Sequence, residues 1–257
     1  MDLSSLVSVY EGSKAPSYIS CLFYGDPGTG KTTLAATFPK PFFIDADKGL
    51  SAVKSDVNRI SLDREAKDAN GQPLDYFDLV RQVLDDALLR RGIFGPEGKA
   101  AGAETIVFDS ITTLGELIMN RIMRNNHKDP LKDKPGYDEW GVFQRCMIDI
   151  AMRIKDLRES YNVILTAWST VRENEKTEVV SGFPMLPGSY RERAGGDFDE
   201  FYYMESRRGP SGLEVTLNAI PCGIYKAKSR ILAPADRKMV DPTYQKIMES
   251  AKRHRAK

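Results

Sequence analysis

One short run constrains the fold of this chain more than any other feature of its sequence. Residues 25–32 read Gly-Asp-Pro-Gly-Thr-Gly-Lys-Thr and match the phosphate-loop pattern G-x-x-x-x-G-K-[ST] at every fixed position. In this pattern the glycines let backbone N–H groups close around phosphate oxygens, the lysine adds a positive charge, and the next hydroxyl can bind Mg²⁺. The run predicts a nucleoside triphosphate site contacted by Gly25, Asp26, Pro27, Gly28, Thr29, Gly30, Lys31, Thr32 and Thr33.

The residues on either side of this run predict how it is held. Residues 18–24 are apolar enough for a buried strand, and residues 32–38 suit a short helix. Because a helix N-terminus carries partial positive charge, this order points it at the phosphates. The alternative is a glycine-rich turn without a ligand, but Lys31 and the two threonines after it have no turn-forming purpose.

Apolar runs alternate with amphipathic segments through much of the chain. The runs are typical of strands buried on both faces and cover residues 40–47, 105–109 and 162–168. Helical spacing of apolar residues covers residues 76–91, 111–124 and 140–160. Together these segments predict an α/β fold with a mainly parallel central sheet flanked by helices.

The C-terminal part has a different character. Residues 172–199 are rich in glycine and proline, which predicts a long mobile loop. Short antiparallel strands are predicted after it, over residues 201–205, 213–217 and 220–226.

Length and composition indicate one globular unit. The 257 residues suffice for one sizeable α/β domain, and no low-complexity linker divides them. We expect a single domain over residues 1–257, made of an N-terminal extension (1–17), a core (18–235) and a basic C-terminal tail (236–257). No apolar run approaches the roughly 20 residues that span a bilayer, and the N-terminus does not resemble a secretory signal. These features predict an intracellular protein with no membrane partner.

Cysteines and charge add two constraints. Cys21, Cys146 and Cys222 are widely separated, which supports neither a disulfide framework nor a zinc site. The net charge of +1 gives no overall signature of nucleic-acid binding. Local basic patches occur at residues 121–136 and 246–257, although each patch alone is also typical of a solvated surface.

Acidic residues at two strand ends complete the expected site. Asp109 ends a buried strand, where a carboxylate is costly unless it faces a cation, so we interpret it as a Mg²⁺ ligand acting through water. A helix cap is the alternative role for Asp109. Asp45 and Asp47 follow the strand after the phosphate loop, and their spacing would point both to one side. We favour Asp47 as the group that orients an attacking water, with solvated acids at a strand end as the alternative.

Several ordered motifs resemble the RecA-like recombinase ATPases. Within them, residues 18–237 are most similar to the small phage RecA-core proteins proposed for single-strand annealing and recombination. Residues 44–50 (Ile-Asp-Ala-Asp-Lys-Gly-Leu) are similar to the segment that ends in the family's catalytic glutamate, whose place Asp47 takes. Residues 107–111 (Val-Phe-Asp-Ser-Ile) resemble the Walker B strand.

The same resemblance extends to the second half of the chain. Residues 162–172 are similar to the strand that carries the γ-phosphate sensor, with Trp-Ser-Thr at 168–170 where the family usually has Gln, Asn or His. The loops at 127–136 and 172–199 take the places of the first and second DNA-binding loops. In residues 226–234, Lys228 and Arg230 match a basic pair that reaches the γ-phosphate of the neighbouring subunit. Their spacing puts both side chains on one face of an extended strand.

The resemblance implies a DNA-stimulated ATPase that uses ATP and Mg²⁺, with Lys31, Asp47, Lys228 and Arg230 as catalytic residues and Thr32 and Asp109 at the metal. It also implies single-stranded DNA as a partner, self-association into a filament or ring, and a cytoplasmic location, in the host cell if the gene is carried by a phage. A non-hydrolysing, ATP-gated annealing module and a hexameric motor or loader of the RecA branch stay open as alternatives. A phosphate-loop kinase ranks last, because no arginine-rich lid is apparent.

Overall fold

An eight-stranded sheet forms the centre of the computed structural model, which describes residues 16–62, 67, 71–72, 75–174, 178–186, 190–209 and 212–256. The order across this sheet is β10-β9-β8-β1-β5-β4-β2-β3. The strands are β1 (Ser20–Tyr24), β2 (Pro41–Asp45), β3 (Asn58–Ser61), β4 (Thr105–Asp109), β5 (Asn162–Ala167), β8 (Glu200–Gly209), β9 (Gly212–Asn218) and β10 (Lys238–Val240). The run from β8 to β3 is parallel, whereas β9 and β10 pair antiparallel at one edge.

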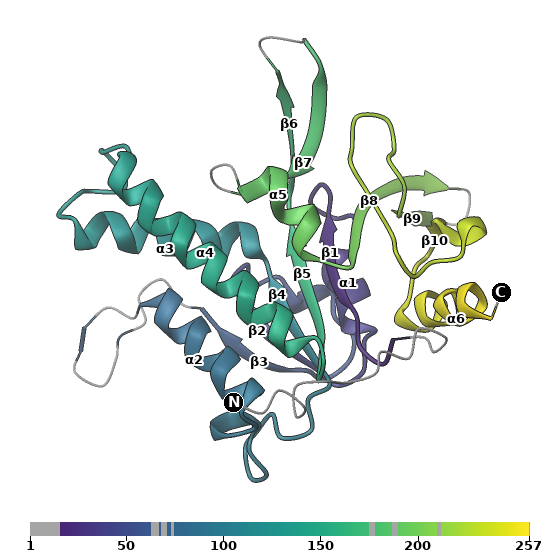
Figure 1. The fold of residues 1–257 in the computed structure, drawn as a ribbon, viewed down its shortest axis with the longest axis horizontal. Helices are drawn as coiled ribbons and strands as arrows, with labels where there is room; N and C mark the ends of the chain where they lie inside the picture. Colours follow the sequence, from purple (N-terminus) through teal and green to yellow (C-terminus); the bar gives the residue numbers. More distant parts are fainter. Residues whose placement is uncertain are drawn as a thin grey trace, which may run out of the picture.

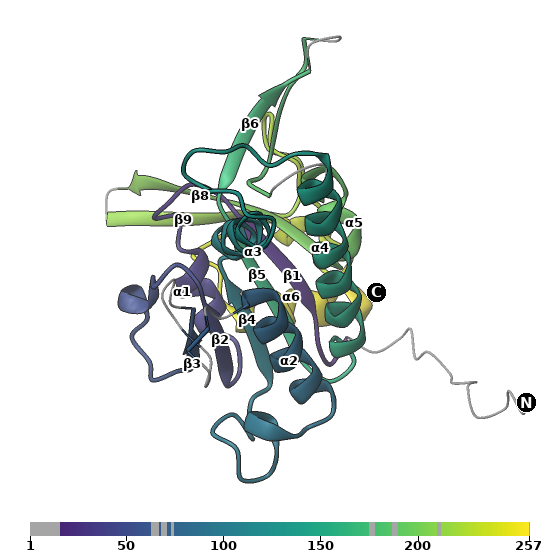
Figure 2. The same ribbon diagram turned by 90° about the vertical axis from the view of Figure 1, so that its left-hand side faces the viewer.

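Helices cover both faces of this sheet (Figure 1 and Figure 2). One face carries α2 (Tyr76–Leu88), α3 (Ile111–Asn125), α4 (Tyr137–Leu157) and α5 (Tyr190–Asp197), and the other carries α1 (Lys31–Ala36) and α6 (Tyr244–Arg255). Side chains of β1 alternate between the two cores: Leu22 and Tyr24 pack under the first group, Cys21 and Phe23 under the second. Continuous apolar strands arise because both faces are buried. The predicted α/β class is confirmed, including its parallel sheet and its antiparallel C-terminal strands.

The described residues between 172 and 199 do not form the long mobile loop that the glycines and prolines of this segment suggest. They continue a hairpin of β6 (Ser169–Glu173) and β7 (Val180–Pro184), which projects from the sheet in Figure 1, and they then form α5. Gly182 has a packing reason, because a Cβ there would lie 2.2 Å from the ring of Tyr225. Pro187 and Gly188 lie outside the described residues.

The C-terminal region also departs from expectation. No strand forms over residues 220–226, and the third antiparallel strand is β10, which pairs with β9. Residues 236–256 are not a tail: Ile247 and Ala251 of α6 are fully buried against the sheet, whereas Lys246, Lys252 and Arg253 are exposed. The periodicity of α6 was obscured by its many charges. Lys257 and residues 1–15 of the expected extension lie outside the described residues.

In the described part of the chain, the three cysteines are free, and no group of His, Cys, Asp and Glu is arranged to hold a metal by itself. None of the described helices has the length and apolar character that crossing a membrane requires.

A buried acid fixes the connection between α3 and α4. Glu139 is 3% exposed and accepts hydrogen bonds from Asn126 Nδ2 (2.7 Å), Lys128 Nζ (2.6 Å) and Gly136 N (2.6 Å). These bonds lower the pKa of Glu139 to about 2. Lys128, one of the charges in the predicted basic patch, is therefore neutralised within the fold.

We predict that Glu139→Gln lowers the free energy of unfolding at neutral pH. Because the folded-state pKa lies below the unfolded value of about 4.3, the carboxylate stabilises the fold above that pH and loses its effect as the pH falls toward 2. Urea unfolding of wild type and variant between pH 7 and pH 2.5 should show a difference that shrinks with acidification. A difference independent of pH would contradict this role.

Candidate nucleotide-binding site

The phosphate loop joins β1 to α1 at the carboxyl edge of the parallel strands. A Cβ on Gly25 would lie 2.1 Å from the carbonyl oxygen of Met204 on the adjacent strand β8, so only glycine fits there. Gly28 and Gly30 have φ angles of +81° and +79°, the left-handed region that favours glycine. All three glycines of the motif therefore have a steric reason, and the loop is shaped before any ligand binds.

Lys31 lies inside this loop. Its side chain is 8% exposed, and Nζ donates hydrogen bonds to the carbonyl oxygens of Gly25 (2.9 Å) and Asp26 (2.8 Å). Burial lowers the pKa of Lys31, whereas the charges of Asp109, Asp26 and Asp47 raise it. Anionic phosphate oxygens at the loop would restore favourable surroundings for the ammonium group.

Asp109, at the end of β4, is hydrogen-bonded to the last residue of the phosphate loop. Thr32 Oγ1 donates to Asp109 Oδ2 at 2.9 Å. The carboxylate is 2% exposed, and burial raises its pKa, although bonds from Thr166 and Thr32 lower it. A desolvated carboxylate beside a hydroxyl provides the oxygen ligands that Mg²⁺ prefers, with phosphates and waters to complete the shell. Thr32 and Asp109 are thus the residues that could hold Mg²⁺.

Thr166 of β5 is part of this site and was not anticipated from the sequence. Its Oγ1 donates to Asp109 Oδ1 at 2.5 Å. Strand β5 is the neighbour of β4 in the sheet, which brings Thr166 beside the carboxylate. The sequence feature that could have identified Thr166 is a single threonine inside an otherwise apolar strand.

The two acids after β2 have different surroundings. Asp45 is fully buried and accepts bonds from Arg59 Nη1 (2.6 Å) and Lys48 N (2.8 Å), so it has a structural role. Asp47 lies beyond the end of the strand, is partly exposed, and accepts a bond from Ser110 Oγ at 2.9 Å. The spacing argument fails because β2 ends at Asp45, but Asp47 remains the acid beside Asp109 and Lys31.

Of the three residues in the expected sensor position, Ser169 contacts the phosphate loop. Its hydroxyl donates to Asp26 Oδ1, and its N–H donates to Gly25 O at 3.2 Å. Trp168 is 39% exposed, and Thr170 lines a different cavity. The loop is therefore bonded to the start of the β6–β7 hairpin.

A cavity of about 570 Å³ extends from the phosphate loop toward α6. Its loop side is formed by Gly28, Gly30, Lys31 and the two threonines after it, and its far side by Leu213, Val215, Asp241, Pro242 and Thr243. The volume is typical of a pocket for a ligand of nucleotide size. The far side was missed from the sequence because it combines β9 with the turn before α6, both distant in the chain from the loop.

Lys228 and Arg230 are not near the phosphate loop of their own chain. The backbone of Lys228 pairs with Phe201, and Arg230 Nη1 contacts Asp199 Oδ1 at 3.3 Å. Asp199 in turn accepts a bond from Ser20, the first residue of β1, whereas the loop follows the last residue. At a rise of about 3.3 Å per residue, about 13 Å of strand separates these ends. Lys228 and Arg230 do lie together, since the charge of Arg230 contributes to lowering the pKa of Lys228, after burial.

Glu200 positions the turn that carries Arg230. This role of Glu200 was not predicted from the sequence. Its buried carboxylate accepts bonds from Ser229 Oγ (2.5 Å), Arg230 N (2.8 Å) and Ile231 N (3.2 Å), and also from the hydroxyl of Tyr202. Burial raises the pKa of Glu200. The only hint in the sequence was an acid beside the first residue of a predicted strand.

These features define a P-loop nucleotide-binding domain. Residues 17–231 match the family described as AAA domain, AAA_24, and the chain belongs to this family.

Two solved structures resemble the chain distantly. A KaiC-like protein of the hyperthermophilic archaeon Pyrococcus horikoshii is 14% identical, with 78% of each chain covered and a TM-score of 0.42. The flagellar accessory protein FlaH of Methanocaldococcus jannaschii is also 14% identical, with 86% of this chain and 84% of the other covered and a TM-score of 0.40. Neither is similar enough to bear on activity. No curated protein matches the chain.

We predict that Thr166→Val lowers kcat for ATP hydrolysis about 10- to 100-fold, the usual effect of losing a hydrogen bond to a metal ligand. The affinity for nucleotide should change little, because the contacts of the phosphate loop are intact. Thr166→Ser keeps the hydroxyl and should retain most of the rate. Steady-state kinetics that give the valine variant a wild-type kcat would contradict the positioning of Asp109 by Thr166.

Proposed function

We propose that the protein is an ATP-dependent, single-stranded-DNA-binding ATPase of RecA type that acts in recombination or strand annealing. It self-assembles head to tail, with ATP and Mg²⁺ between neighbouring subunits. Thr32 and Asp109 hold Mg²⁺, which neutralises charge on the phosphates. Lys31 binds the phosphates directly, and Asp47 orients the attacking water.

One observation carries this proposal. Among the described residues that line the nucleotide cavity, Lys31 is the sole cation. Phosphoryl transfer commonly needs a second positive group at the transition state. Lys228, which is half-buried, and Arg230, which is exposed, provide a basic pair at the other end of the same sheet. A head-to-tail assembly brings that end of one subunit to the loop of the next, because heterologous interfaces join two different surfaces of the same molecule.

The DNA-binding part of the proposal rests on position. The loop between α3 and α4 and the β6–β7 hairpin extend on the side of the sheet where the phosphate loop lies (Figure 1 and Figure 2). Leu131 and Tyr137 of that region are 94% and 93% exposed. Hydrolysis at the loop can then reset DNA affinity through the bonds between Ser169 and the phosphate loop.

We predict that two inactive variants restore each other. Lys31→Ala removes the phosphate-binding lysine, and Arg230→Ala removes the basic group offered to the neighbour, so each alone should lose about 10³-fold or more in hydrolysis. In an equimolar mixture, about a quarter of the interfaces pair an intact loop with an intact Arg230. ATPase assays of the mixture should recover a corresponding part of the wild-type rate.

The control is Lys31→Ala mixed with the double variant Lys31→Ala, Arg230→Ala, which offers no intact loop and should stay inactive. Light scattering should show co-assembly in both mixtures. If the variants co-assemble but ATPase activity does not recover, the active site is not shared between subunits.

A non-hydrolysing annealing module is the second candidate, favoured by the surroundings of Asp47. Its carboxylate is one methylene shorter than the glutamate of the family and accepts the bond from Ser110. If Asp47 activates water, Asp47→Ala lowers hydrolysis about 10²- to 10⁴-fold and abolishes ATP-dependent turnover of DNA complexes. If nucleotide only gates assembly, annealing of complementary strands in a fluorescence-quenching assay persists in this variant and with a non-hydrolysable ATP analogue.

A further inference from the structure

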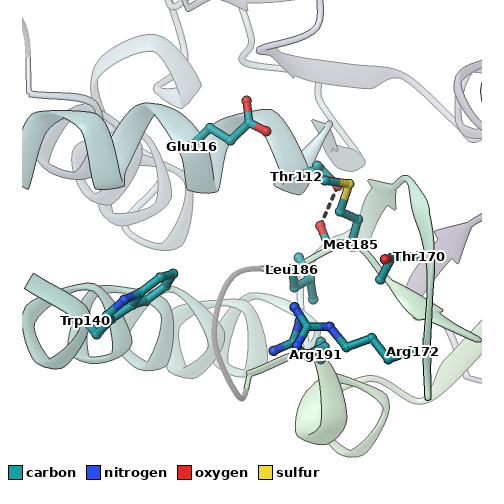
Figure 3. Close-up of a pocket in the computed structure, with 8 residues that line it drawn as sticks. All are labelled: Thr112, Glu116, Trp140, Thr170, Arg172, Met185, Leu186 and Arg191. Carbon is teal, nitrogen blue, oxygen red and sulfur yellow. Dashed lines mark hydrogen bonds between the residues drawn. The ribbon is translucent and has the colours of Figure 1, made fainter. Parts of the chain in front are cut away.

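A second cavity lies between the helical layer and the β6–β7 hairpin, apart from the nucleotide site. Its volume is about 210 Å³, and its wall combines Trp140 of α4, Arg172 of β6, Met185, Leu186, and Glu116 of α3 (Figure 3). The volume is below the roughly 300–1,000 Å³ typical of sites for whole drug-sized ligands. The cavity therefore suits one flat ring system.

Trp140 provides a rigid aromatic surface at this cavity. The indole is 38% exposed and packs at 85° to the buried ring of Phe143, with ring centroids 5.9 Å apart. This contact fixes the orientation of the indole while leaving part of it accessible. Tyr137, three residues earlier on the same helix and therefore on the same side, is 93% exposed. Of these two aromatic residues, Trp140 lines the cavity.

Positive charge lies beside the aromatic surface. In Figure 3 the side chain of Arg172 reaches from β6 into the space below Leu186, and Arg191 of α5 lines the same wall. Arg172 is exposed and forms no ion pair with the residues that the structure describes. Glu116 is the one acid of the lining, on the opposite helix. An aromatic platform beside arginines is the combination that binds a base and its phosphate.

We propose that this cavity holds one unstacked base of single-stranded DNA, with the base on Trp140 and the adjoining phosphate on Arg172. This inference rests on the proposed function, for which it names the contact with DNA. Hydrogen bonds also connect the wall of this cavity to the phosphate loop. Thr112 Oγ1 donates to Met185 O at 2.8 Å and accepts from Trp168 N at 3.1 Å, and Ser169 beside Trp168 holds the phosphate loop. A base at Trp140 therefore contacts elements that are bonded to the loop.

The test measures the affinity of the full-length protein for a labelled thymidine oligonucleotide by fluorescence anisotropy, with a non-hydrolysable ATP analogue, over a series of salt concentrations. Trp140→Ala should weaken binding roughly 5- to 150-fold, the effect of removing one stacking platform, without changing the salt dependence. Arg172→Gln should reduce the slope of log affinity against log salt by about 0.7, the value for one phosphate contact on a single strand. The two variants thereby separate base from phosphate recognition.

Three controls accompany this measurement. Trp140→Phe keeps an aromatic ring and should retain most of the affinity, and Glu116→Gln removes the acid of the lining and should not weaken binding. An abasic oligonucleotide of equal length should bind wild type only as well as the normal oligonucleotide binds Trp140→Ala. Thermal unfolding checks that each variant is folded. If Trp140→Ala does not fold, Arg172→Gln still tests the cavity, because Arg172 is an exposed residue of the hairpin.

The outcomes are distinguishable. If wild type binds DNA but neither Trp140→Ala nor Arg172→Gln alters binding, the cavity is not the contact, and the proposed function stands. Equal affinity for abasic and normal DNA also overturns the base pocket alone. If wild type hydrolyses ATP but binds no single-stranded DNA, both the pocket and the DNA-binding function are overturned.

Discussion

The buried carboxylate of Asp109 is the constraint on which the rest of the site depends. Isolated burial of a charge is costly, and here the cost appears as a raised pKa. Two hydroxyls, from Thr32 and Thr166, offset part of it through hydrogen bonds. These three residues come from α1, β4 and β5, so satisfying one carboxylate fixes the relative position of three elements. A cation placed beside it would complete the compensation.

The close approach of β8 to β1 is the second determinant. Gly25 touches the carbonyl of Met204, so the phosphate loop begins where β8 allows it. Tyr24, the residue before the loop, stacks on Phe201 with centroids 5.1 Å apart and donates to Lys226 O at 2.5 Å. Tyr203 and Tyr225 stack at 3.8 Å in the same cluster. The segment that carries Lys228 and Arg230 is thereby anchored to the strand that carries the loop.

Elements with continuous apolar runs could be predicted from the sequence. A strand that is buried on both faces is apolar along its whole length, whichever elements pack against it. The strand at 105–109 and the helix after it agree with β4 and α3. The hairpin and α6 could not be predicted, for different reasons. Gly182 in β7 meets a packing need created by Tyr225, and α6 buries Ile247 and Ala251 in a segment rich in basic residues. The composition of the hairpin suggested a flexible loop, and that of α6 suggested a solvent-exposed tail. In both cases contacts with distant segments determined the structure.

Within the site, the sequence by itself determined the phosphate loop, because its chemistry is local: three glycines, a lysine and a hydroxyl in one turn. It also predicted Asp109 as a buried acid at a strand end, and the structure places this carboxylate beside the hydroxyl of Thr32. Only the tertiary structure showed that Asp45 is paired with Arg59, added Thr166 and Glu200, and separated Lys228 and Arg230 from their own loop. These results depend on which strands are neighbours in the sheet. Strand order is set by packing between distant segments, and no local pattern of residues encodes it.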